Sequence, residues 1–98
     1  MITIDKALQL IQDSIDSLHR SGLIEENIKV TPETAIMGKG TQLDSIAFVT
    51  FITDLEDRLI LESGKEVFFV LNDIGDFDIN NPYLSAKAIA DYIIKLLN

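Results

Sequence analysis

The chain has 98 residues, of which 47% are hydrophobic, so it is long enough for one domain with one modest core. It contains no cysteine, which excludes disulfides, thiolate metal sites and a cysteine nucleophile. Eight basic residues against 16 acidic ones give a formal net charge of -8, which repels nucleic acid phosphates and anionic lipid head groups. The acidity favours basic partners, or it serves only to keep the protein soluble. No run is apolar enough to span a bilayer and no apolar signal segment is present, so we expect a cytoplasmic protein.

The first predicted element is an amphipathic helix from Ile4 to Arg20. Thr3 can cap it, and Ser21-Gly22 ends the pattern because glycine suits a left-handed C-terminal cap. Apolar residues recur at spacings of three and four along it: Ile4, Ala7, Leu8, Ile11, Ile15 and Leu18. One face of this helix therefore belongs to the core.

A long connection follows from Leu23 to Leu43, and Pro32, Gly38 and Gly40 prevent it from continuing a helix. It nevertheless carries apolar side chains, namely Leu23, Ile24, Ile28, Val30, Ile36 and Met37. A loop this long is unusual in a compact domain unless such side chains attach it to the body. We expect it to lie across the helices.

The second predicted helix spans Asp44 to about Leu61. At 100° per residue, one face is apolar and is the predicted core side, with Phe48, Phe51, Ile52, Leu55 and Leu59. The opposite side carries Ile46, Val49, Thr53, Asp57 and Ile60. Val49 and Ile60 are either covered by the long loop or exposed for a partner to dock on, and the sequence does not decide between these two possibilities. Ile46 is assigned to docking because it is next to Ser45.

The last third of the chain is predicted as an extended segment, a short helix and a final long helix. The run from Val67 to Leu71 favours a strand on propensity, but no second strand candidate exists, so we expect an extended segment whose Phe68 or Phe69 enters the core. A short helix from Asn72 to Phe77 follows. Ser85 caps the final helix, whose apolar residues are Ala86, Ile89, Ala90, Ile93, Leu96 and Leu97. The predicted fold class is all-α, with three main helices, one short helix and a long first loop.

Ser45 is the candidate functional residue because it lies where a polar loop meets the longest helix. Asp44 can act as the helix cap, which leaves the Ser45 hydroxyl free at the positive end of the helix dipole, where an attached phosphate is favoured. Catalysis by Ser45 needs a base, and the chain has one histidine, His19, at the end of the first helix. We therefore predict that Ser45 is a substrate for another enzyme and that the chain is not itself an enzyme.

No metal site is predicted. Asp76, Asp78 and Asn80 bear oxygen on alternate residues, with Asp73 nearby, but the positions that a calcium-binding loop fills with Gly and Glu hold Asn81 and Lys87.

The motif Leu43-Asp44-Ser45-Ile46 resembles the Asp-Ser-Leu attachment site of acyl carrier proteins, with Ile46 in place of the usual Leu. The stretches 34–38 and 90–93 are also similar to that family, and the resemblance covers essentially the whole chain as a single carrier domain, 1–98. It implies an acyl-carrier-like four-helix bundle in which Ser45 carries 4'-phosphopantetheine from coenzyme A. The thiol of that group holds an acyl chain as a thioester for enzymes of fatty-acid, lipid or secondary-metabolite synthesis.

The resemblance also implies partners: a phosphopantetheinyl transferase, and acyl- or aminoacyl-loading and acyl-using enzymes with basic docking surfaces. In this family the helix after the serine is the recognition helix, which assigns partner binding to Ile46, Val49, Thr50, Thr53, Glu56 and Asp57. The chain departs from typical fatty-acid carriers because Ile46 to Phe51 contains no acidic residue. This departure favours a specialised carrier, expected to be a monomer.

Two alternatives remain open at the level of sequence. One is an aminoacyl or peptidyl carrier of nonribosomal synthesis, which has the same attachment chemistry and different partners. The other is a helical protein-interaction adaptor in which Ser45 is unmodified and Ile46, Val49 and Ile60 bind a partner helix.

Overall fold

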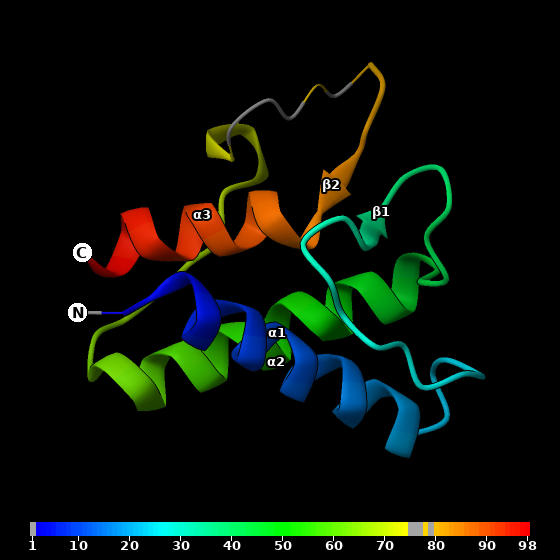
Figure 1. Ribbon diagram of the computed structural model, residues 1–98, viewed down its shortest axis with the longest axis horizontal. Helices are drawn as coiled ribbons and strands as arrows, with labels where there is room; N and C mark the ends of the chain where they lie inside the picture. The colour runs from blue at the N-terminus through cyan, green and yellow to red at the C-terminus, as the bar shows by residue number, and fades with distance from the viewer. Residues whose placement is uncertain (1, 75–77, 79) are drawn as a thin grey trace.

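In the residues that the structure describes, the protein is mostly helical, with three α-helices and one two-stranded sheet (Figure 1). The computed structural model describes residues 2–74, 78 and 80–98. Its elements are α1 (Ile4–Arg20), β1 (Ala35–Met37), α2 (Ser45–Ser63), β2 (Leu84–Ser85) and α3 (Ala86–Leu97). In Figure 1, α2 and α3 run in the opposite direction to α1, which packs against both of them. The prediction of a helical bundle is therefore consistent with the observed arrangement.

The predicted helix ends are close to the observed ones because side-chain caps define them. The Thr3 side chain accepts a hydrogen bond from the Lys6 amide at 3.2 Å, and α1 has the predicted bounds. Helix α2 begins at Ser45 and ends at Ser63, two residues beyond the prediction. Gly64 ends it in the left-handed conformation, with φ 71°. Within the described part of the chain, no helix is long and apolar enough to cross a membrane.

The loop from α1 to α2 lies on the helices, as predicted. Ile24, Ile36 and Leu43 are buried in the core. The Gln12 side chain holds the loop as well, because it donates to the Ile28 carbonyl at 2.9 Å and accepts from the Val30 amide at 2.7 Å. The loop is thus an ordered wall of the bundle.

The sheet is a feature that the all-α prediction omitted. Strands β1 and β2 are antiparallel, with Met37 opposite Leu84 and Ala35 opposite Ser85. They are three and two residues long, too short to produce an alternating pattern in the sequence. Their pairing joins the loop before α2 to the start of α3.

The segment after α2 is extended and belongs to no sheet, as predicted. Val67 is buried and Phe69 packs against the core, whereas Phe68 is 68% exposed, so Phe69 is the aromatic residue that turns inward. The predicted helix from Asn72 to Phe77 is a single 3-10 turn, η1 (Leu71–Asp73), as far as it is described; residues 75–77 lie outside the described residues.

Candidate functional site

Ser45 is the first residue of α2 and is exposed. The capping role falls to Asp44, whose Oδ1 accepts a hydrogen bond from the Ala47 amide at 2.8 Å, while its carbonyl accepts from Phe48, also at 2.8 Å. Among the described residues, the Ser45 hydroxyl and the amides of Ser45 and Ile46 form no hydrogen bond. The start of α2 therefore presents one hydroxyl and two N–H donors to solvent.

Two features of the preceding loop fix the position of this helix start. The Thr41 hydroxyl donates to the Ile36 carbonyl at 2.8 Å and accepts from the Leu43 amide at 3.1 Å. The Leu43 side chain is buried, with 6% of its surface exposed. Because Leu43 and Ala47 are anchored in the core on either side of it, Ser45 is held at the surface by the fold.

An apolar groove of about 360 Å³ opens beside Ser45. The loop and β1 form one wall, and the first turns of α2 and the start of η1 form the other. Its lining consists of Ile36, Met37, Gly38, Thr41, Leu43, Asp44, Ser45, Phe48, Val49 and Leu71. All but a few of these side chains are apolar, so the groove suits a hydrocarbon chain attached near Ser45.

The predicted partner residues at the start of α2 lie on one exposed face. Ile46 is 69% exposed and Val49 is 62% exposed. The hydroxyls of Thr50 and Thr53 donate to the carbonyls of Ile46 and Val49, at 2.8 and 3.0 Å, respectively. Since these hydroxyls are used within the helix, this face offers mainly methyl groups to a partner.

The remaining predicted partner residues are in different environments. Asp57 is exposed on the same face, but Glu56 is half-buried and its Oε2 accepts a hydrogen bond from the Phe69 amide at 2.8 Å. The sequence left open whether Ile60 and Val49 are covered or exposed. Ile60 is partly buried and packs against the core, whereas Val49 is exposed.

Sequence reasoning missed two groups of residues near the site. Met37 and Leu71 line the groove. Met37 belongs to β1 and Leu71 to the 3-10 turn η1, two short elements that the sequence pattern did not predict. Phe68 and Val70 are exposed on the extended segment, at 68% and 49%. Residues 67–71 are all apolar, so the sequence has no period-two pattern that could have separated the inward from the outward side chains.

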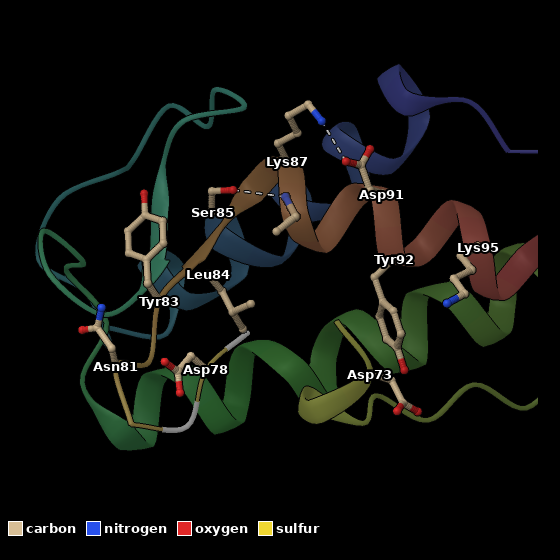
Figure 2. A pocket seen from close by; sticks show the side chains of 11 residues that line it. Asp73, Asp78, Asn81, Tyr83, Leu84, Ser85, Lys87, Asp91, Tyr92 and Lys95 are labelled. Carbon is tan, nitrogen blue, oxygen red and sulfur yellow. Dashed lines mark hydrogen bonds and ion pairs between the residues drawn. The ribbon is translucent and has the colours of Figure 1, made fainter. Parts of the chain in front are cut away.

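A second groove of about 700 Å³, lined by both polar and apolar residues, lies along α3 (Figure 2). Lys87 Nζ donates to Asp91 Oδ2 at 2.8 Å across one helical turn, and this hydrogen bond and the Asp91 charge raise the pKa of Lys87. The other lining residues include Asp73, Tyr83 and Lys95. In the described part of the chain no group of acidic and histidine residues is arranged to hold a metal ion; of the stretch 73–80, residues 75–77 and 79 lie outside it.

The chain was also compared with known proteins. No family model, no curated protein sequence and no solved structure matches it. The geometry around Ser45 is therefore the observation on which a functional assignment depends.

Proposed function

We propose that this protein is an acyl carrier protein in which Ser45 is the attachment residue for 4'-phosphopantetheine. When bound, this group supplies a thiol that holds an acyl chain as a thioester. The chain itself contains no cysteine, so a thioester on this protein requires a thiol brought in from outside. Two observations support the proposal: the sequence motif at 43–46 and the exposed position of Ser45 at the start of α2.

The observation that carries the proposal is the division of roles between Asp44 and Ser45. Asp44 satisfies the Ala47 amide, so the Ser45 hydroxyl is not needed as a cap and remains exposed. The amides of Ser45 and Ile46 have no hydrogen-bond partner among the described residues, and the positive end of the helix dipole lies at this helix start. A phosphodiester on Ser45 fits this environment, because both donors and the dipole favour its negative charge.

The attachment reaction is a phosphoryl transfer that a separate transferase performs with Mg²⁺ and coenzyme A. Ser45 Oγ bonds to the phosphorus that bears the pantetheine arm, the bond from that phosphorus to the adenosine bisphosphate breaks, and the hydroxyl proton leaves to a base of the transferase. The products are phosphopantetheinyl-Ser45 and adenosine 3',5'-bisphosphate. In this step the chain's contribution is an accessible and fixed nucleophile.

The groove beside Ser45 supports an acyl cargo over an aminoacyl one. Six of its ten described lining residues are aliphatic or aromatic, and Asp44 is the one charged residue among the ten. An apolar chain is stabilised there by about 25 cal/mol for each Å² removed from water, whereas a charged amino group loses hydration and has in the lining one acidic partner, Asp44, whose Oδ1 already accepts from the Ala47 amide.

The direct test is intact-mass analysis after incubation with coenzyme A, Mg²⁺ and a broad-specificity phosphopantetheinyl transferase. We expect a mass increase equal to one phosphopantetheine group, and no increase for Ser45→Ala. Ser63→Ala is the matched control, since it removes a serine at the other end of the same helix and should leave the modification intact. An unmodified wild-type protein would favour the adaptor alternative.

Loading of the modified protein separates the two carrier classes. Acyl-group donors should give a stable thioester, and aminoacyl donors should be poor substrates. Preferred aminoacylation would favour the carrier of nonribosomal synthesis and would contradict the assignment of the groove to hydrocarbon.

A further inference from the structure

The chain that leads into α2 has few backbone hydrogen bonds. Among the described residues, the amides of residues 42 to 47 reach no backbone carbonyl, and two of them are bonded by side chains instead. The Ala47 amide donates to Asp44, which caps the helix, and the Leu43 amide donates to Thr41. The direction in which α2 begins therefore depends on these side chains.

Thr41 links the start of the helix to the sheet. Its hydroxyl accepts from the Leu43 amide at 3.1 Å and donates to the Ile36 carbonyl at 2.8 Å. Ile36 is the central residue of β1 and is fully buried. Strand β1 is paired with β2, which leads directly into α3. One hydroxyl thus connects the residue before the Asp44 cap to a strand that is itself paired with another part of the chain.

The turn around Thr41 directs its side chain back toward β1. The Thr41 amide donates to the Gly38 carbonyl at 3.1 Å, and Gly38 and Gly40 have φ of +98° and +90°. Glycine adopts positive φ without steric cost, so the chain reverses within a few residues. Because Thr41 is half-buried in this turn, its two hydrogen bonds are partly shielded from water.

The other two anchors at the helix start do not replace this link. The Asp44 cap bonds the Ala47 amide of its own helix, so it closes the first turn without orienting α2 against the rest of the fold. The buried Leu43 side chain fixes how deep the chain lies, but hydrophobic contacts have no preferred direction, whereas hydrogen bonds do. Since the Ser45 hydroxyl has no hydrogen bond among the described residues, its direction follows from the backbone that Thr41 orients.

We propose that Thr41 is a positioning residue for the modification of Ser45; this inference rests on the function proposed for that serine. In the attachment reaction Ser45 Oγ must lie in line with the phosphorus–oxygen bond that breaks. Thr41 acts through the Leu43 amide, two residues before Ser45, and takes no part in the bonds that form or break. By limiting the directions that Ser45 Oγ samples, it raises the fraction of bound carrier that is ready to react.

The test is the steady-state kinetics of Ser45 modification by a broad-specificity phosphopantetheinyl transferase with coenzyme A and Mg²⁺. The value of kcat is referred to the folded fraction of each variant, measured by circular dichroism at the assay temperature. Thr41→Val removes both hydrogen bonds, and we expect kcat to fall about tenfold while KM for the carrier stays within about twofold of wild type. Thr41→Ser keeps the hydroxyl and should restore kcat to within about twofold of wild type.

Thr34→Val is the matched control. The Thr34 hydroxyl also accepts from a backbone amide of the same loop, that of Thr31 at 2.8 Å, but it lies before β1 in the chain. Its loss should leave kcat within about twofold of wild type.

The outcomes separate this inference from the function on which it rests. A wild-type protein that is not modified overturns both. A modified wild type with unchanged kcat in Thr41→Val, or with a rise in KM alone, overturns the positioning role alone. An equal fall of kcat in Thr34→Val, or a fall that Thr41→Ser does not restore, also overturns it. Should Thr41→Val not fold, Thr41→Ala leaves space for water to bond the freed carbonyl and amide, and its folded fraction should show the same fall of kcat; an unchanged kcat there overturns the inference.

Discussion

Helices α2 and α3 begin with the same kind of side-chain cap, but the first backbone amides are hydrogen-bonded to another segment only at α3. Each helix follows a capping residue, Asp44 or Ser85, whose side chain accepts a hydrogen bond from the amide three residues later. At α3 the loop before β1 satisfies the next donors as well, since the Ala86 amide bonds to the Thr34 carbonyl at 2.8 Å and the Lys87 amide to the Pro32 carbonyl at 2.9 Å. At α2 the equivalent amides have no partner in the part of the chain that the structure describes.

The two serines at these helix starts differ for the same reason. Ser85 is half-buried and its hydroxyl is used as the cap, at 3.1 Å from the Ala88 amide. Ser45 is one position later relative to its helix, after an aspartate that does the capping. A serine near a helix start is therefore available for modification only when another residue caps the helix and no other segment covers the first turn.

Gly38→Ala is expected to have the largest effect, because Gly38 lies where the loop leading to α2 meets the segment leading to α3. Its φ is +98°, and a Cβ there would be 2.4 Å from the Pro82 carbonyl oxygen. Left-handed strain and the clash with backbone should lower the free energy of unfolding by about 2 to 4 kcal/mol, measured by urea denaturation.

Gly40→Ala is the control for backbone strain without the clash. Gly40 has φ +90°, but the nearest atom to its added Cβ is the Ala35 Cβ at 3.9 Å. The expected loss is about 1 kcal/mol. Equal losses at the two glycines would mean that the contact between the two segments does not contribute to stability.

Ser85→Ala and Ser45→Ala separate the structural serine from the proposed functional one. Ser85→Ala removes a cap and should cost about 1 kcal/mol of unfolding free energy. Ser45→Ala removes an exposed hydroxyl with no partner among the described residues and should change that free energy by less than about 0.5 kcal/mol. A larger loss at Ser45 than at Ser85 would contradict the assignment of the cap to Asp44.

The smallest expected effect is a change in the pKa of Lys87, in the first turns of α3. The hydrogen bond from Lys87 to Asp91 and the Asp91 charge raise the pKa of Lys87 above its ordinary value of 10.5. Asp91→Asn should lower that pKa, measured by NMR titration of the lysine side chain. A group whose pKa is raised on folding stabilises the fold below its unfolded pKa, and this contribution is lost as the pH rises through the folded pKa. The variant should therefore be slightly less stable than wild type near neutral pH, and the difference should disappear as the pH rises through the folded pKa of Lys87. A stability difference that persists above that pKa would contradict this cause.

Several elements were predictable because their signals are local. The spacing of Ala7, Ile11, Ile15 and Leu18 identifies the buried side of α1, and all four are buried. Caps at Thr3, Asp44 and Ser85 were predicted from residue type and are observed. By contrast, β1 and β2 are defined by a pairing between residues about 50 positions apart, which no window of sequence contains.

For the candidate site, the sequence by itself determined that an aspartate and a serine stand at the start of a long helix in an acidic chain without cysteine. Only the tertiary structure decided that Met37 and Leu71 form a groove beside Ser45, that Glu56 binds the chain after α2, and that Phe68 faces outward while Phe69 faces the core. The physical reason is that caps and helical periodicity act over a few residues. The walls of a groove and the exposure of a side chain depend on which distant segments pack against it.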